Sequence, residues 1–104
     1  MAKPKPRPKG PARSSPPLTP SPTKKFERDT ERMRKRGGDM EKFKAVIVAL
    51  CSRQRLPPEL RDHALGGEWE GCRDCHVAPD WILIYERGTD VLILHRTGSH
   101  SDLF

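Results

Sequence analysis

The sequence predicts an α+β domain in which two N-terminal helices pack on a small, twisted antiparallel sheet, preceded by a disordered tail rich in proline and lysine. Three observations predict this fold. A helical period of apolar residues runs through residues 23–56, three strand-like runs follow between residues 68 and 97, and 104 residues leave room for one hydrophobic core. We therefore expect a tail over residues 1–22 and a single domain over residues 23–104.

The first 22 residues form the expected tail. They hold eight of the eleven prolines, five basic residues and no acidic residue. Such a run has few apolar side chains to bury and few backbone N–H groups to pair, which favours disordered chain that leans toward polyproline II. The tail either strengthens contact with RNA or the ribosome, or is a solvated extension. The second interpretation is the commoner one for basic low-complexity segments.

Two helices are predicted after the tail. The first begins at Thr23 and ends at Gly37-Gly38, because glycine tolerates the left-handed conformation that closes a helix. Asp39 can cap the second helix, whose apolar residues follow the 3.6-residue period until Pro57-Pro58 stops it. The first helix should be mostly solvated, and the second should bury one face in the core.

Three strands are predicted in the second half, over residues 68–77, 80–86 and 91–97, after a loop around residues 57–67. Short separators of hairpin type lie between them, so the strands should be antiparallel. The middle run, Trp81 to Tyr85, is apolar at every position, as expected of a central strand that helices cover on one side.

The positive charge of the chain is unevenly distributed. The formal net charge is +6, and residues 23–104 carry 15 basic against 14 acidic residues, so an RNA-binding surface there must come from local clustering. One such cluster lies in residues 23–36, with seven basic and three acidic residues. Its side chains are candidates for contact with phosphates, in particular Lys24, Lys25, Arg28 and Arg32.

Composition also excludes several classes of protein. No stretch is long and apolar enough to span a bilayer, and the N-terminus lacks the features of a secretory signal, so we expect a cytoplasmic protein with no membrane partner. Three cysteines, Cys51, Cys72 and Cys75, are an odd number in a reducing compartment, which favours free thiols over a disulfide framework.

Residues with chemical capacity gather in the second half of the chain, where all four histidines lie. A metal-independent ribonuclease needs a base for the ribose 2′-hydroxyl, an acid for the leaving 5′-oxygen and a cation near the phosphate. Histidine suits both proton roles because its ordinary pKa lies near neutrality. Any single histidine is more often an ordinary surface residue, so it is the clustering that points to ribonuclease chemistry.

Two long motifs resemble the YafQ family of toxins in the RelE/ParE superfamily. Residues 62–85, DHALGGEWEGCRDCHVAPDWILIY, are similar to the family pattern D-H-x-L-x-G-x-W-x-G-x-R-D-x-H-V-x-P-D-W-I-L-I-Y. Residues 96–104, RTGSHSDLF, are similar to its closing R-T-G-[ST]-H-x-x-L-F. The resemblance covers about the last 45 residues strongly and the two helices only by pattern.

The resemblance implies a set of site residues. His63, His76, Asp80 and His100 would form the proton-transfer group, Arg96 would contact the scissile phosphate, and Phe104 would stack on or support a substrate base. We assign His100 as general acid, with His63 or Asp80 as base. Neither a cofactor nor a metal is expected.

The resemblance also implies a RelE-like fold and a function. The usual first strand of such toxins would fall near residues 15–22, whose prolines predict a poor strand. The chain would be the toxin of a type II toxin–antitoxin system, a ribosome-dependent endoribonuclease that cleaves messenger RNA in the A site of the 70S ribosome by 2′-oxygen attack. Its partners would be the ribosome, messenger RNA and a cognate antitoxin, the last in a hetero-oligomeric complex.

Several alternatives stay open at this point. Cys72 to His76 spell C-x-x-C-H, a motif of covalent haem attachment that also suggests a zinc site, although export and a second ligand pair are lacking. The tryptophans Trp69 and Trp81 fit packing better than catalysis, and His95 fits an ordinary strand position. A non-catalytic RNA- or ribosome-binding module, or an inactive toxin that acts with its antitoxin as a transcriptional co-repressor, would keep the same basic surface.

Overall fold

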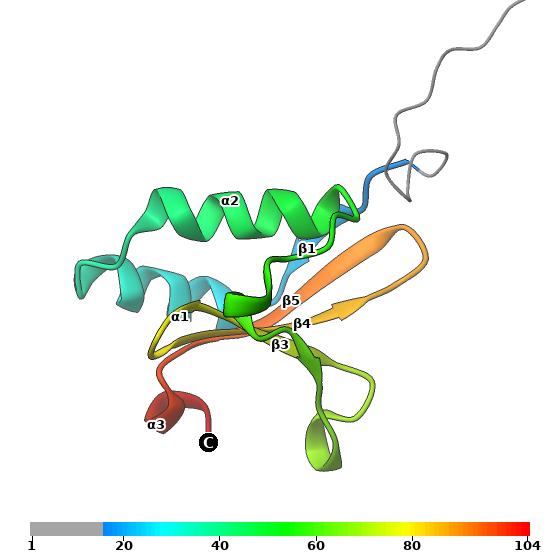
Figure 1. The fold of residues 1–104 in the computed structure, drawn as a ribbon. Coiled ribbons are helices and arrows are strands. Elements are labelled where there is room, and N and C mark those ends of the chain that lie inside the picture. The colour runs from blue at the N-terminus through cyan, green and yellow to red at the C-terminus, as the bar shows by residue number, and fades with distance from the viewer. Residues whose placement is uncertain (1–15) are drawn as a thin grey trace, which may run out of the picture.

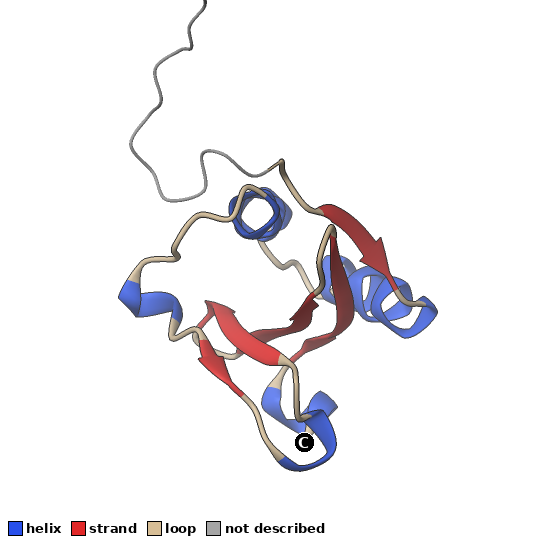
Figure 2. Cartoon of the chain, turned by 90° about the vertical axis from the view of Figure 1, so that its right-hand side faces the viewer, coloured by secondary structure: helices blue, strands red, loops and turns tan. Residues whose placement is uncertain are grey.

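The computed structural model describes residues 16–104, so most of the predicted tail lies outside the described residues. They form a five-stranded sheet of order β1-β5-β4-β3-β2, with α2 on one side and the short α3 on the other (Figures 1 and 2). The elements are β1 (Thr19–Pro22), α1 (Lys24–Lys35), α2 (Met40–Cys51), β2 (His63–Ala64), β3 (Arg73–Ala78), β4 (Trp81–Arg87), β5 (Val91–Gly98) and α3 (His100–Leu103), with 3-10 turns η1 (Pro58–Leu60) and η2 (Gly67–Trp69).

The first strand corrects two predictions. β1 pairs with β5 in parallel, so the sheet is mixed, and the domain begins before Thr23 because Leu18 is already buried in the core. The prolines do not prevent the strand. Thr19 and Thr23 donate their N–H groups to β5 or the residue before it, whereas Pro20 and Pro22 occupy the alternate positions, where an N–H would face away from the sheet.

Both predicted helices are confirmed, with one change of length. Thr23 accepts a hydrogen bond from the Phe26 N–H at 3.0 Å, and Asp39 accepts one from the Lys42 N–H at 3.1 Å, so each caps its helix as expected. α2 ends at Cys51 rather than at the later prolines. The chain turns there because Arg53 adopts a left-handed conformation with φ of 62°.

The main core lies between the two helices and one face of the sheet. Phe43 of α2 stacks on Trp81 of β4 with ring centroids 4.9 Å apart, and the Trp81 indole donates to Thr97 Oγ1 at 2.8 Å. Gly38 lies against the same indole. Trp81 is therefore a packing residue, as predicted.

A second, smaller cluster lies on the opposite face of the sheet. Cys72, Ile82 and Ile84 are buried there beneath Leu65, Trp69 and Leu103, which come from the segment around η2 and from α3. One predicted boundary changes in this region, and one helix is new. The strand expected from residue 68 begins at Arg73, because η2 and a left-handed Gly71 (φ 91°) precede it, and α3 was not predicted.

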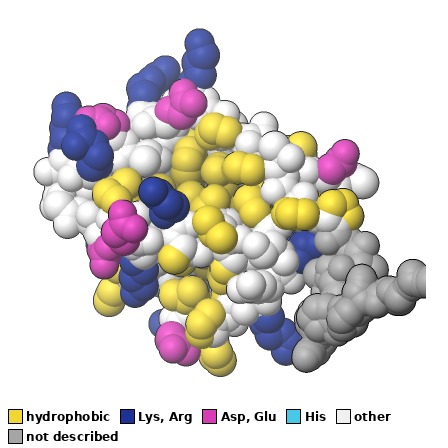
Figure 3. Space-filling view, turned by 90° about the horizontal axis from the view of Figure 1, so that it is seen from above, with side chains coloured by type: hydrophobic (Ala, Val, Ile, Leu, Met, Phe, Trp, Pro, Cys, Tyr) yellow, Lys and Arg dark blue, Asp and Glu magenta, His cyan; other side chains and the backbone are white. Residues whose placement is uncertain are grey.

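The surface on the α2 side carries hydrophobic side chains across its middle, with basic and acidic groups around them (Figure 3). Val48 of α2 is one of the exposed large hydrophobic residues. No histidine shows on this face (Figure 3), so the candidate chemistry lies elsewhere on the molecule. Within residues 16–104, no helix has both the length and the apolar character needed to cross a bilayer.

Candidate active site

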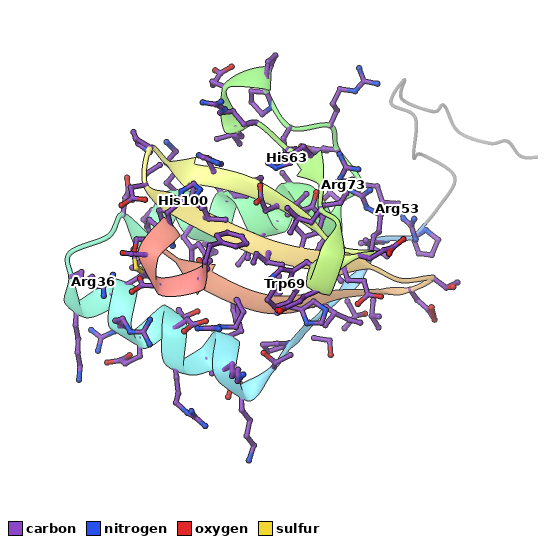
Figure 4. The ribbon with its side chains drawn as sticks, turned by 90° about the horizontal axis from the view of Figure 1, so that it is seen from below. Arg36, Arg53, His63, Trp69, Arg73 and His100 are labelled. Atoms are coloured by element: carbon purple, nitrogen blue, oxygen red, sulfur yellow. The ribbon has the colours of Figure 1, made fainter. Side chains whose placement is uncertain are left out.

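Three of the four histidines converge on one open groove on the face of the sheet away from α2. His63 comes from β2, His76 from β3 and His100 from α3 (Figure 4 labels the first and last). The groove has a volume of about 600 Å³ and is lined by Arg61, His63, Leu65, Asp74, His76, His100 and Phe104. Three members of the proton-transfer group that the resemblance implied thus line one groove, although they come from distant parts of the sequence.

Successive side chains of β3 point to opposite faces of the sheet, which explains how two of these residues reach the groove. Asp74 and His76 lie two residues apart and face the groove, whereas Cys75 and Val77 point into the main core. The ring centroids of His76 and His100 are 6.3 Å apart, and that of Phe104 lies 5.7 Å from His100. At these separations the rings are within the range of aromatic contact, so His76, His100 and Phe104 form one continuous wall of the groove.

Asp74 is the buried acid of the groove, and the sequence prediction did not include it in the site. Its side chain is 5% exposed, and its Oδ1 lies 3.3 Å from His63 Nδ1. That distance suits an ion pair, yet Oδ1 has no hydrogen-bond partner among the described residues, because His63 Nδ1 contacts the Arg61 carbonyl oxygen at 2.8 Å. Burial raises the pKa of Asp74, while His63, His76 and His100 act in the opposite direction.

The position of His100 depends on the caps of α3. Ser99 and Asp102 form a reciprocal capping box at the start of this helix, and Arg36, which follows α1, holds Asp102 at 2.8 Å. Asp80, on the turn before β4, accepts a hydrogen bond from the His100 backbone N–H at 3.1 Å. Its Oδ1 also lies 4.0 Å from His100 Nδ1, so these two members of the predicted proton-transfer group lie close together.

Arg96 lies outside the histidine groove. Its Nε and Nη2 donate to the buried carboxylate of Asp29 at 2.6 and 3.1 Å, which leaves Nη1 as the nitrogen that Asp29 does not use. This hydrogen-bonded pair raises the pKa of Arg96. The side chain lines a neighbouring groove with Lys24, Lys25, Trp69 and His95.

The other predicted basic residues differ in their surroundings. Arg32 lies 3.5 Å from Asp29 and 3.9 Å from Asp102, so part of its charge is neutralised within the protein. Arg28, like Lys24 and Lys25, is exposed on α1. The buried Asp29 was not predicted, because nothing in the pattern of α1 distinguishes it from the acidic residues on the solvated face.

The C-x-x-C-H motif does not form a metal or haem site. Cys72 packs in the cluster beneath Trp69, while Cys75 lies in the main core on the other face, where burial raises the pKa of its thiol to about 12. Among the described residues, the side chains that could converge on a metal ion are instead Cys72, Glu86 and His95, with ligand atoms within 4.8 Å of one another. His95, predicted as an ordinary strand residue, pairs with Glu86 at 2.9 Å.

The sequence prediction also missed a second concave surface. A cleft of about 610 Å³ lies between the segment that follows α2 and the edge of the sheet, and its lining includes Arg53, Arg55, Arg61, Arg73 and Arg87. These residues are spread over 35 positions of the sequence, so no local run of charge marks the cleft.

Comparison with known proteins places this geometry in a family. The family model described as the bacterial toxin of a type II toxin–antitoxin system, YafQ, matches residues 18–104. The mRNA interferase toxin YafQ of Escherichia coli K12 is 42% identical over 80 residues, which are 76% of this chain and 87% of that protein.

Solved structures agree with the sequence comparison. The crystal structure of YafQ from Escherichia coli BL21(DE3) superimposes with a TM-score of 0.79 at 38% identity, over 84% of this chain and 98% of that chain. The crystal structure of the Escherichia coli DinJ–YafQ complex gives a TM-score of 0.78 at 39% identity, with the same two coverages.

Proposed function

This chain belongs to the YafQ family of type II toxin–antitoxin toxins, and on that premise we propose that it cleaves messenger RNA in the ribosomal A site and so inhibits translation. It is an endoribonuclease of the mRNA interferase class, like its relatives at 42% identity. The single observation that supports the site is the convergence of His63, Asp74, His76 and His100 on one groove. Cleavage on the ribosome would take place in the cytoplasm.

The reaction that these groups suit is transesterification by the ribose 2′-oxygen. A bond forms between the 2′-oxygen and phosphorus, and the bond from phosphorus to the 5′-oxygen breaks. The base accepts the 2′-hydroxyl proton, and the acid gives a proton to the 5′-oxygen. The products are a 2′,3′-cyclic phosphate and a 5′-hydroxyl end.

The geometry favours His63 over Asp80 as the base. Because His63 Nδ1 contacts the Arg61 carbonyl oxygen, the tautomer that donates from Nδ1 leaves Nε2 free to accept a proton from the substrate. The buried carboxylate of Asp74 beside it stabilises the imidazolium that results. Asp80 instead accepts the His100 N–H and lies on an exposed turn, where it holds His100 in place.

His100 serves as the general acid, and its neighbours complete the site. Its ring lies in the groove with its Nδ1 4.0 Å from the Asp80 carboxylate. Phe104, 59% exposed and next to His100, offers an aromatic face on which a base can stack. Because Arg96 lies outside the histidine groove, it would present Nη1 to a backbone phosphate in the neighbouring groove, where Lys24 and Lys25 also attract the RNA backbone. The ribosome supplies the strand in a bent conformation that brings the 2′-oxygen into line.

We also propose that a cognate antitoxin neutralises the protein by covering the histidine groove. The Escherichia coli relative has been crystallised as a toxin–antitoxin complex, DinJ–YafQ. A partner that contacts both the groove and the basic side chains of α1 would need acidic residues on its own surface. The complex would be a hetero-oligomer.

The function is tested by induced expression in cells, with growth and messenger-RNA 5′ ends recorded in the same cultures. Wild type should arrest growth and create new 5′ ends at particular codons, and His100→Ala and Asp80→Ala should do neither at equal protein level. Lys44→Gln is the control, because it changes an exposed side chain on α2, on the opposite side of the sheet from the groove. Equal cleavage by His100→Ala would reject the assignment of His100 as the acid, and growth arrest without cleavage would favour a non-catalytic ribosome-binding module or a co-repressor.

A further inference from the structure

Five arginines converge on a cleft that the catalytic scheme does not use. They come from the segment between α2 and β2, from β3 and from the end of β4, and they are Arg53, Arg55, Arg61, Arg73 and Arg87. Figure 4 shows two of them, Arg53 and Arg73, at the end of the sheet away from Arg36. We refer to these five side chains and the space between them as the arginine cleft.

Contacts within the protein fix three of the five side chains around the cleft. Arg53 donates from Nε to the Pro16 carbonyl oxygen at 2.8 Å and from Nη2 to that of Thr89 at 3.2 Å. Arg87 lies over the ring of Tyr85, with its Cζ 5.8 Å from the centroid. Arg73 donates from Nε to the carboxylate of Asp62. These contacts orient three of the five arginines before any ligand binds.

The charge of the cleft is largely uncompensated. Asp62 is the one acid among the described residues that line it, and its Oδ1 already accepts from Arg73 Nε at 3.0 Å and from the Tyr85 hydroxyl at 2.7 Å. Arg55, Arg61 and Arg87 are exposed around it. Like charges held this close repel one another, and an anion bound between them removes that repulsion. Guanidinium groups match the oxygens of phosphate in particular.

The arginine cleft is continuous with the histidine groove. Arg61 lines both spaces, and its carbonyl oxygen is the group that contacts His63 Nδ1. Its backbone is left-handed, with φ of 53°, so the chain turns sharply between the two spaces. An RNA strand whose scissile phosphate lies beside His63 enters the arginine cleft when it leaves the groove on the side of Arg61.

We propose that the arginine cleft binds the backbone phosphates of the messenger-RNA nucleotides next to the scissile one. This inference rests on the proposed function, because it takes the strand in the histidine groove to be RNA. The shared wall at Arg61 favours the substrate strand over an acidic segment of the antitoxin. It also favours that strand over ribosomal RNA, because only the substrate strand occupies the histidine groove that shares Arg61 with the cleft.

The test measures binding of a fluorescent single-stranded RNA to full-length His100→Ala protein over a range of salt concentrations, so that binding is read without cleavage. The variant carries Arg55→Gln, Arg61→Gln and Arg87→Gln, the three exposed members of the cleft. Removal of one arginine–phosphate pair should lower the slope of log affinity against log salt by about 0.7, so the slope should fall by about 2 in the triple variant. Lys42→Gln and Lys44→Gln on α2 remove charge outside both the arginine cleft and the basic cluster of residues 23–36, and they should change the slope far less.

Further measurements distinguish messenger RNA from ribosomal RNA and from the antitoxin as the ligand of the cleft. In the active background, the double variant Arg55→Gln, Arg87→Gln, which keeps the groove residue Arg61, should raise KM for cleavage of messenger RNA on ribosomes and leave kcat nearly unchanged, with an unaltered circular dichroism spectrum. An unchanged slope, or an equal change in the lysine control, would overturn the proposal. The proposal would also be overturned if the variant bound the oligonucleotide normally but no longer co-sedimented with ribosomes, or no longer bound the antitoxin. Those results would assign the cleft to ribosomal RNA or to the antitoxin. Failure of wild type to cleave any message would reject the proposed function, and the salt slopes would still report on the cleft.

Discussion

The buried carboxylate of Asp29 should be the most stabilising single acid of this fold. It is 2% exposed and receives three hydrogen bonds, two from Arg96 and one from the Thr97 backbone N–H at 3.2 Å. The last bond gives the Thr97 N–H an acceptor at a point of β5 beyond Leu94, the last residue that pairs with β1. Asp29→Asn keeps the shape of the side chain but replaces one acceptor oxygen with an NH2 group. That group would face the N–H donors of Arg96 or Thr97, which it cannot bind.

The size of the effect follows from these contacts. Removal of one partner from a buried, hydrogen-bonded ion pair costs about 3–5 kcal/mol, and because Arg96 retains some exposure we expect about 2–4 kcal/mol here. For a domain of this length that corresponds to a fall in Tm of roughly 10–25 °C. The guanidinium of Arg96 would also no longer be fixed beside Lys24 and Lys25.

Chemical and thermal denaturation of Asp29→Asn, made in the inactive His100→Ala background to avoid toxicity, measures the effect. Glu31→Gln is the control on the same helix, because the pair of Glu31 with Arg34 is exposed to solvent and its removal should change stability little. A destabilisation below about 1 kcal/mol for Asp29→Asn, or an equal destabilisation for Glu31→Gln, would refute the view that this ion pair anchors α1 to β5.

Three further changes probe the core, the α3 anchor and the substrate contact. Gly38→Ala places a Cβ 2.7 Å from the Trp81 ring and should destabilise by about 1–3 kcal/mol in urea, whereas Gly66→Ala meets nothing within 4 Å and should be close to neutral. The pKa of Asp102 is held well below its ordinary value, first by Arg36, so this group adds stability above the pKa of an unfolded carboxyl that is lost as pH falls. Between pH 6 and 3 the urea midpoint of wild type should therefore fall more than that of Asp102→Asn, and parallel curves would show that the ion pair adds nothing. Phe104→Ala should leave Tm unchanged because the ring is exposed, yet slow cleavage about tenfold or more if it stacks on a base, and full activity would remove it from the site.

Much of the fold was predictable because local signals and tertiary structure agree. Thr23 and Asp39 cap their helices as their residue types predict, and the apolar run of β4 becomes the central covered strand. The resemblance placed a first strand near residues 15–22, but the prolines argued against it, because proline statistics do not reveal which N–H groups face a neighbour. The later start of β3 depends on the left-handed Gly71, whose conformation the sequence permits but does not require.

The site was predictable in part. The resemblance identified His63, His76 and His100, which the structure brings to one groove. Asp74 was passed over because a buried acid and an exposed acid look alike in a strand pattern, and its burial arises only when β2 and α3 close over β3. The arginine cleft combines residues from three separate segments, and such a surface exists only in the folded chain.

The most direct test of the central claim is single-turnover cleavage of a messenger RNA programmed into purified ribosomes, with the chemistry of the new ends determined. Wild type should give a 2′,3′-cyclic phosphate and a 5′-hydroxyl, and His100→Ala should react about 10²–10⁴-fold more slowly while binding the programmed ribosome equally well. Ends with a 5′-phosphate, or a His100→Ala rate equal to that of wild type, would contradict the assignment of the histidine groove as the catalytic site.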